Sequence, residues 1–406
     1  MSRKRSIIVV LCLLMMVISA CSEAEQAPRE TVVPTVTAEL AEEGEARAIL
    51  QSREGTNEWF AEYAAFIEET MAASNLPGAA VAVVLGDESV FLEGFGVRDL
   101  KSGASVTPET LFHIASTHKS MTAMMIATLV DEGLLEWDTP VVEIYPDFEL
   151  SDAEATQLVT IRHLLSMRSG IPDDAEDDFD LEDSTAAEVF DLVAEAPLLG
   201  LPGDAFSYSN PSSAISGYLG VLAAGGEVDD LYDGYADLLQ EQLLDPIGMN
   251  SATIYASQAR QNPNLSNSYI LDDNNQPIEA DSYDVDGDPL APSGSLKASA
   301  AEMALYISTQ LNRGVAPNGT QVVSAKNLTE TWTPYLENYA MGWETHQHQG
   351  VKLIQHEGSY DNFLSIIGFI PQLNAGFVIL TNSEDAGGPL IADAPLMLVE
   401  LLLQNQ

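Results

Sequence analysis

LFHIASTHK, residues 111–119, is the segment around which this chain is organised, and it runs directly into an apolar stretch, residues 121–130. Within it, Ser116 and Lys119 lie three positions apart, so on a helix they share one face, one turn apart. A serine hydroxyl is a poor nucleophile until a neighbouring base removes its proton, and a lysine amine at this spacing can be that base. Chance alone predicts roughly half a Ser-x-x-Lys match in such a chain, so the motif needs support from elsewhere.

The N-terminus has the features of a bacterial export signal. A basic region, Arg3-Lys4-Arg5, precedes an apolar region, residues 7–18, that is short for a membrane span. The segment ends in Ile18-Ser19-Ala20-Cys21, which resembles a lipobox. We therefore expect residues 1–20 to be a lipoprotein signal peptide and Cys21 to be acylated. The alternative is an ordinary signal peptide that happens to contain a cysteine.

The acidic stretch that follows, residues 21–54, has the composition of a tether and favours the lipoprotein interpretation. The expected location is the cell envelope, on the periplasmic side or in the outer membrane of a Gram-negative host. The lipid at Cys21 would be the membrane contact. Because Cys12 leaves with the signal peptide, the mature chain has no pair of cysteines for a disulfide.

The composition limits the size of the fold and the class of partner. The chain has 406 residues, of which 46% are hydrophobic, enough for a sizeable core in one large domain or two intertwined ones. Its 62 acidic and 16 basic residues give a formal net charge of −46. Such a charge repels nucleic acid and anionic lipid surfaces, so neither is an expected partner. Salt would screen the self-repulsion, which suits a saline habitat, but simple solubility explains the charge equally well.

The order of predicted elements indicates an α/β (α+β) domain that is split in two. Patterns typical of helices occur at 57–74, 296–313 and 389–403, and patterns typical of strands at 79–85, 89–96, 340–345, 351–356, 363–370 and 375–380. Strands at both ends of the chain therefore form one domain, residues 55–136 and 292–406, with a mainly helical insertion, residues 137–291. No Gly-x-Ser-x-Gly sequence occurs, which excludes the nucleophile elbow of the α/β-hydrolases.

Two groups of residues could suggest a metal site. The run Asp173–Asp183 is dense in carboxylates, but it lacks the alternating acids and the glycine of a calcium loop, so we interpret it as a solvated loop or helix face. His346 and His348 have no third ligand in view, and we interpret them as part of a polar turn between strands. The sequence predicts no metal and no cofactor.

Two further motifs support the Ser116 hypothesis. Tyr208-Ser209-Asn210 supplies Tyr-x-Asn within the helical insertion, and His356-Glu357-Gly358 supplies His-x-Gly at the end of an apolar strand. With three motifs in this order, residues 55–400 resemble the penicillin-recognising serine hydrolases, on the branch of class C β-lactamases, D-alanyl-D-alanine carboxypeptidases and related esterases. The resemblance extends to three accessory stretches, RHLLSMRSG at 162–170, LDPIGM at 244–249 and AMGW at 340–343.

The resemblance implies a β-lactamase/transpeptidase-like fold, in which helices flank an antiparallel sheet, and an acyl-enzyme mechanism. Ser116 would be acylated, and Lys119 and Tyr208 would share the proton transfers. A lysine beside a tyrosine should lower the pKa of the phenol, and the phenolate should raise the pKa of the lysine. Asn210 would hold Lys119 and contact the substrate amide.

The third motif would form the other side of the cleft. By the resemblance, the backbone N–H groups of Ser116 and Ser359 would stabilise the oxyanion, and His356, Gly358 and Ser359 would bind substrate. His356 stands where many β-lactamases have a lysine. Because a histidine is only partly charged at neutral pH, it would hold a substrate carboxylate less firmly, which argues against a dedicated β-lactamase.

Two of the motifs have a second match, and chain order decides between the candidates. Tyr360-Asp361-Asn362 also fits Tyr-x-Asn, but it follows the third motif directly instead of lying in the insertion. His348-Gln349-Gly350 also fits His-x-Gly, but it lies outside the apolar strand that ends at His356. Tyr208 and His356 are therefore the predicted site residues.

The sequence thus predicts a lipid-anchored serine hydrolase that acts on amide or ester bonds of a small-molecule or peptidoglycan-like substrate. D-alanyl peptidase and esterase activities are favoured over a weak β-lactamase activity, although specificity depends on loops around the cleft that the motifs do not describe. The alternative from another class is a catalytically inactive envelope lipoprotein that binds peptidoglycan or a protein partner.

Overall fold

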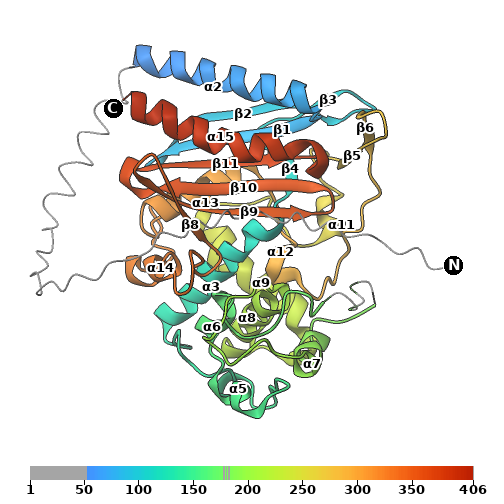
Figure 1. Cartoon of the computed structure of the whole chain (residues 1–406), viewed down its shortest axis with the longest axis vertical. Coiled ribbons are helices and arrows are strands. Elements are labelled where there is room, and N and C mark those ends of the chain that lie inside the picture. Colours follow the sequence, from blue (N-terminus) through green and yellow to red (C-terminus); the bar gives the residue numbers. More distant parts are fainter. Residues whose placement is uncertain (1–52, 177–178, 180, 182, 406) are drawn as a thin grey trace, which may run out of the picture. The chain divides into compact units, whose positions relative to one another are not determined.

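The computed structural model describes residues 53–405 except 177, 178, 180 and 182. The predicted signal peptide, the predicted lipidation site Cys21 and nearly all of the predicted tether lie outside the described residues. Over the described part, the chain forms a seven-stranded antiparallel sheet with helices on both faces, and a group of shorter helices lies beside the sheet (Figure 1). The helix-flanked antiparallel sheet expected from the sequence is confirmed.

The sheet is built from the two ends of the chain. Its strand order is β3-β2-β1-β11-β10-β9-β8, so the N-terminal hairpin joins the C-terminal strands where β1 pairs with β11. The strands are β1 (Gly78–Leu85), β2 (Glu88–Asp99), β3 (Ala104–Ser105), β8 (Glu344–His348), β9 (Val351–Tyr360), β10 (Phe363–Ile370) and β11 (Ala375–Thr381). Two small sheets pair β4 (Leu111–His113) with β7 (Lys297–Ser299) and β5 (Tyr269–Leu271) with β6 (Pro277–Glu279).

The two faces of the sheet bury separate cores, because successive side chains of a strand point to opposite faces. On β1, Val81 lies in the core under α2 (Arg53–Ser74) and α15 (Glu384–Gln404), which run side by side over one face (Figure 1). Its neighbour Ala80 lies in the core on the face that α13 (Ala300–Leu311) covers. Helix α15 has the length and composition of a membrane span, but its Leu390 and Leu398 are fully buried in the core under it.

Between the two halves of the sheet the described chain is mainly helical. Its helices are α3 (His118–Glu132), α4 (Val141–Ile144), α5 (Ala153–Leu158), α6 (Ile161–Leu165), α7 (Glu188–Glu195), α8 (Asn210–Ala223), α9 (Leu231–Leu239), α10 (Asp245–Ile247), α11 (Ala256–Ala259) and α12 (Ala291–Gly294), and α14 (Ala325–Thr331) follows α13. Helices α3, α8 and α12 pack against one another. Whether residues 137–291 are a domain of their own stays a prediction.

Two predicted elements differ from the structure. The helix predicted from residue 296 begins only at Ala300, because Lys297–Ser299 pair with β4. Ser299 then caps the helix by accepting the backbone N–H of Glu302 at 3.2 Å. The strand predicted at 340–345 is displaced to Glu344–His348, so the expectation that His346 and His348 lie in a turn is wrong: both lie in β8.

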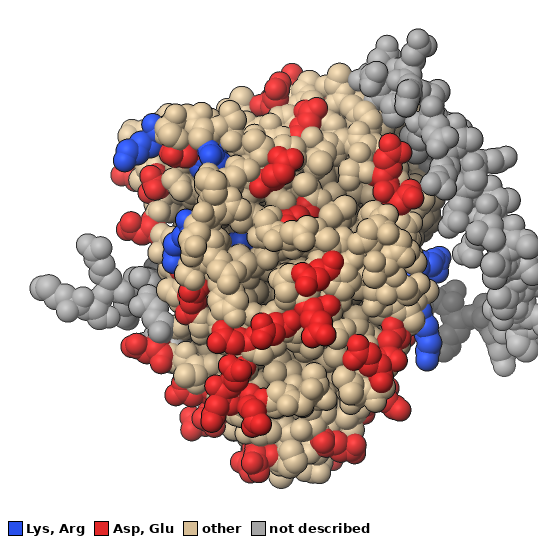
Figure 2. Space-filling model, turned by 180° about the vertical axis from the view of Figure 1, so that it is seen from behind, with Lys and Arg blue, Asp and Glu red and all other residues tan. Residues whose placement is uncertain are grey.

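Acidic side chains are more frequent than basic ones on the face that Figure 2 draws. Figure 2 shows Asp and Glu spread over one face, where Lys and Arg are few. This distribution agrees with the formal net charge of −46. The field of such a face attracts cations and repels anionic molecules that approach the protein.

Candidate active site

Ser116 lies in a tight turn between β4 and α3. Ala115 adopts a left-handed conformation with φ of 51°, and a short 3-10 helix that begins there leads into α3. The hydroxyls of Thr117 and Ser365 each donate a hydrogen bond of 2.7 Å to the carbonyl oxygen of Ile114. These contacts place Ser116 at the N-terminal end of α3, where its side chain stays partly exposed while the flanking residues are buried.

Lys119 is held beside Ser116 by three contacts, although its side chain is only 1% exposed. Its Nζ lies 2.9 Å from Ser116 Oγ, 2.7 Å from Asn210 Oδ1 and 2.8 Å from the carbonyl oxygen of Ser293. Burial lowers the pKa of Lys119 to about 7, because little water remains to stabilise the charge. A neutral amine has two hydrogens for Asn210 and Ser293 and a lone pair for the hydroxyl of Ser116, which is the arrangement of a general base.

Tyr208 lies on another side of Lys119, with its ring centroid 4.9 Å from Nζ. Burial raises the pKa of Tyr208 above its usual value, and this effect outweighs an interaction with Ser116 that lowers it. The expected mutual shift, a lowered phenol pKa and a raised lysine pKa, is therefore wrong. Desolvation disfavours both charged forms, so the phenol stays neutral and a large share of the amine is deprotonated at pH 7.

Glu176 is a member of the site that sequence reasoning missed. Its Oε1 accepts a hydrogen bond of 2.7 Å from Nδ2 of Asn210, which leaves the amide oxygen directed at Lys119. The negative charge of Glu176 also raises the pKa of Lys119, in opposition to burial. Glu176 belongs to the acidic run that was expected to be a solvated face. No motif spacing links it to Asn210, which follows 34 positions later.

His356 lies on β9 with 3% of its side chain exposed. Its Nδ1 contacts the carbonyl oxygen of Glu357, and its Nε2 lies 3.1 Å from the hydroxyl of Tyr339. Since a carbonyl can only accept, Nδ1 carries the hydrogen and Nε2 accepts from Tyr339. Burial, together with the charge of Lys119, lowers the pKa of His356 to about 4. His356 is therefore neutral at pH 7, not partly charged as expected.

Aromatic rings form one wall of the site. The ring of Tyr339 lies 5.8 Å from that of His356, 6.1 Å from that of Tyr208 and 5.4 Å from that of Phe206. Such a wall offers apolar contact and a few hydroxyl groups, and its histidine carries no charge at neutral pH. No group of three or more residues that could bind a metal occurs among the described residues.

Strand β9 passes the Ser116 turn at very short range. It pairs with β8 only as far as Gln355, so its later residues pair with β10 alone among the described strands. A Cβ on Gly358 would lie 2.7 Å from the backbone nitrogen of Ser116 and 2.7 Å from the oxygen of Ile114, so no larger residue fits there. The His-x-Gly motif therefore reaches the nucleophile turn. The role of Ser359, the next residue, stays a prediction.

The second matches to the motifs lie outside this arrangement. Asp361 and Asn362, with φ of 50° and 63°, make the turn between β9 and β10. His348 pairs with Val351 at the far end of the β8–β9 hairpin from His356. The structure brings together six of the predicted residues, namely Ser116, Lys119, Tyr208, Asn210, His356 and Gly358.

Comparison with known proteins supports the family resemblance seen in the three motifs. The family model described as Beta-lactamase matches residues 63–402. An unguisins hydrolase of Aspergillus campestris is 28% identical over 80% of this chain and 61% of its own length. Penicillin-binding protein 4 of Amycolatopsis lactamdurans is 28% identical over 76% of this chain and 81% of its own. This chain thus spans less than two thirds of the unguisins hydrolase.

Solved structures agree with the sequence relatives. A penicillin-binding protein homologue from Pyrococcus abyssi, described as octameric, has a TM-score of 0.72 and 26% identity, over 85% of this chain and 77% of its own. A class C β-lactamase from Rhodobacter sphaeroides shares the fold, with a TM-score of 0.66 at 19% identity, over 84% of this chain and 99% of its own. Because the family model spans most of the chain and includes all three motifs, this protein belongs to the β-lactamase family of serine hydrolases.

Proposed function

We propose that this protein cleaves amide or ester bonds through an acyl-enzyme at Ser116. The observation that carries the proposal is the 2.9 Å contact between Ser116 Oγ and the buried amine of Lys119. Lys119 takes the hydroxyl proton as Oγ attacks the substrate carbonyl. The relatives named as a hydrolase and as a penicillin-binding protein support a reaction at a carbonyl group.

The neighbouring groups have roles that fit this reaction. The N–H groups of Ser116 and Ser359 stabilise the oxyanion as it forms. Tyr208, whose pKa is raised by burial, keeps its proton at neutral pH. It donates that proton to the leaving group and regains one from the protonated Lys119. In the second half of the cycle, Lys119 takes a proton from the water that attacks the acyl-enzyme and returns it to Ser116 Oγ as the acyl–oxygen bond breaks.

The charges around the cleft favour a substrate without a carboxylate beside His356. Both ring nitrogens of His356 are engaged, and the residue is neutral at pH 7. The carboxylates of Glu344 and Glu176 both act on Tyr208. A substrate carboxylate here would be repelled by these two carboxylates, and the neutral ring of His356 supplies no charge to balance it. We therefore propose a neutral ester or an internal peptide amide as the substrate class, ahead of β-lactams.

A D-alanyl peptidase is the second candidate. The relative named penicillin-binding protein 4 favours it, at 28% identity.

The competing, non-enzymatic function is that of an envelope protein that binds peptidoglycan or a protein partner. Export and a lipid anchor at Cys21, which lies outside the described residues, are proposed for the hydrolase and for the non-catalytic protein alike.

Replacing Ser116 with Ala should abolish hydrolysis of a p-nitrophenyl ester, a D-alanyl peptide and a chromogenic cephalosporin, because the covalent path has no substitute nucleophile. Labelling by a fluorophosphonate should disappear as well, with the melting temperature unchanged. Ser257→Ala, an exposed serine on α11, is the matched control and should keep full activity. A wild-type protein that neither turns over nor becomes labelled would support the binding function instead.

Activity should rise with pH through about 7, because Lys119 acts in its deprotonated form and its pKa is lowered to that value. Glu176→Gln keeps an acceptor for Asn210 but removes the charge that raises the pKa of Lys119. The acid limb of the kcat/KM profile should therefore move to lower pH. Asp174→Asn, an exposed residue of the same acidic run, should leave the limb in place. A shift to higher pH in the Glu176 variant would contradict the electrostatic role.

His356→Ala should lower kcat/KM for a neutral ester by about 10- to 1000-fold. His348→Ala should change kcat/KM little, because His348 is half-buried in β8 at the far end of the hairpin from His356. His356→Lys should improve the use of a carboxylate-bearing substrate relative to the neutral ester, because it supplies a cation to the aromatic wall. Steady-state kinetics on both substrates measure these effects. Equal losses at His356 and His348 would mean that the third motif has been placed on the wrong strand.

Cys21→Ser should release the protein from membranes, since Cys21 is the proposed anchor. Fractionation together with intact mass measures both membrane binding and acylation. A variant that stays membrane-bound and keeps a lipid mass increment would rule out the anchor at this position.

A further inference from the structure

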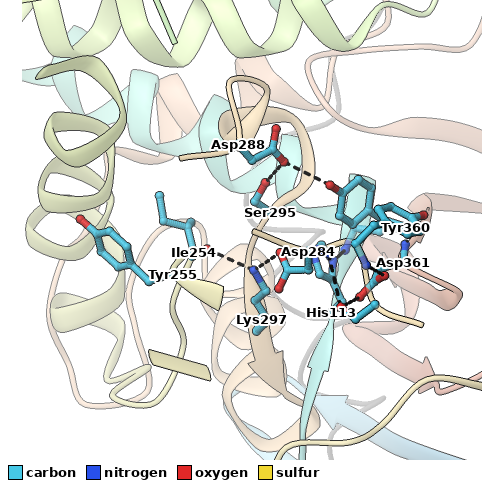
Figure 3. A network of polar contacts seen from close by, with 12 residues as sticks. His113, Ile254, Tyr255, Asp284, Asp288, Ser295, Lys297, Tyr360 and Asp361 are labelled. Atoms are coloured by element: carbon cyan, nitrogen blue, oxygen red, sulfur yellow. Dashed lines mark hydrogen bonds and ion pairs between the residues drawn. The ribbon is translucent and has the colours of Figure 1, made fainter. Parts of the chain in front are cut away.

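A buried polar cluster lies behind the Ser116 turn, and none of its side chains takes part in the proposed chemistry. At its centre, Oδ1 of Asp284 lies 2.7 Å from Nζ of Lys297 and 3.8 Å from Nε2 of His113 (Figure 3). Lys297 also donates to the carbonyl oxygen of Ile254 at 3.1 Å. The side chains of His113 and Lys297 are each 2% exposed. Buried charges are costly unless they are paired, and the carboxylate of Asp284 and the ammonium of Lys297 pair with each other here.

His113 is the member of the cluster that touches the Ser116 turn. Its Nδ1 lies 3.2 Å from the backbone nitrogen of Ala115, which carries a hydrogen and can only donate. Nδ1 therefore accepts, and the ring hydrogen lies on Nε2, on the side of Asp284. Burial lowers the pKa of His113, which favours this neutral ring.

The residue that His113 holds has a strained backbone. Ala115 has φ of 51°, in the left-handed region that residues with a Cβ rarely adopt. Such a conformation persists only where the surrounding contacts determine it. The hydrogen bond to His113 fixes the N–H of Ala115, while two hydroxyls fix the preceding carbonyl, that of Ile114. The next residue is Ser116, so any relaxation of this turn moves the nucleophile.

The same cluster also reaches the strand that carries the third motif. The ring of His113 lies 4.6 Å from the ring of Tyr360, the residue after Ser359. The hydroxyl of Tyr360 lies 3.5 Å from Oδ2 of Asp288, which accepts a hydrogen bond of 2.5 Å from Ser295. Figure 3 shows Tyr360 beside His113, with the hydroxyl of Tyr360 directed at Asp288. The ring of His113 thus lies between the nucleophile turn and the end of β9.

We propose that His113 is a positioning residue, which accepts the N–H of Ala115 and packs on Tyr360 so that the left-handed turn directs Ser116 at Lys119 and at the substrate carbonyl. The carboxylate of Asp284, which lies 3.8 Å from Nε2 and is paired with Lys297, favours the tautomer that carries its hydrogen on Nε2. The inference rests on the proposed function, because it gives His113 this task only if Ser116 is the nucleophile. A misplaced nucleophile slows the chemical step. Loss of the His113 contact should therefore lower kcat and leave KM nearly unchanged.

Two variants that carry a neutral amide separate the two ends of the ring. His113→Asn places an acceptor near the position of Nδ1, whereas His113→Gln places polar atoms near Nε2 and leaves the N–H of Ala115 without an acceptor. A cavity of about 260 Å³ borders His113, Asp284 and Lys297, so the longer glutamine side chain has room. Both variants are neutral, which controls for the charge of the cluster.

His113→Asn should keep kcat within about threefold of the wild type, and His113→Gln should lower it by about 10- to 100-fold with KM unchanged. Adding Ala115→Gly to the Gln variant should restore kcat several-fold, because glycine adopts this φ without strain. Equal kcat losses in the Asn and Gln variants, an unchanged kcat in the Gln variant, or no rescue by Ala115→Gly would each overturn the proposal.

Failure of the proposed function gives a different result. In that case Ser116→Ala removes no hydrolytic activity from the wild type, and no Ser116-dependent kcat exists that the His113 variants could lower. If His113→Gln does not fold, the ¹⁵N spectrum of the wild-type histidines decides, with His113 assigned from His113→Asn. A neutral ring protonated at Nε2 supports the proposal, and one protonated at Nδ1 overturns it, since that nitrogen could not accept the N–H of Ala115.

Discussion

The site depends on the removal of one lysine amine from water. Burial moves the pKa of Lys119 from 10.5 to about 7, which corresponds to a bias on the order of 5 kcal/mol against the charged form. The contacts to Ser116, Asn210 and Ser293 suit a neutral amine as well as an ammonium. The fold therefore supplies an amine that is partly deprotonated at neutral pH beside the nucleophile, and no phenolate is needed to account for that base.

The groups around this amine come from segments that lie far apart in the chain. Asn210 begins α8 and Ser293 lies in α12, and both helices pack against α3, which carries Lys119. Gly358 brings β9 against the backbone of Ser116. This convergence explains why the aromatic wall and the carboxylates lie close enough to influence the nucleophile. It also explains why substrate charge should matter, because His356 is neutral and the nearby charge that acts on Tyr208 is negative.

The sequence was sufficient for the features that local chemistry determines. The spacing of Ser116 and Lys119 predicted their contact, and strand patterns at both ends predicted the split sheet. Prediction from the sequence failed where tertiary contacts determine the secondary structure or the membership of the site. Lys297–Ser299 carry a helical pattern but pair with β4, and Glu176 reaches Asn210 from an acidic run that gave no hint of a buried partner. The expected directions of the pKa shifts of Lys119 and Tyr208 are wrong, because desolvation, which depends on the packed structure, outweighs their mutual charge.

The most direct test of this account is a titration of Lys119 itself. The ¹³Cε signals of labelled lysines can be followed by NMR against pH, with Lys119 identified by the signal that is missing in Lys119→Arg. The account predicts a midpoint near 7 for Lys119. A midpoint near 10.5, the ordinary value for lysine, would contradict it, because Lys119 would then be a cation at neutral pH and could not accept the proton of Ser116.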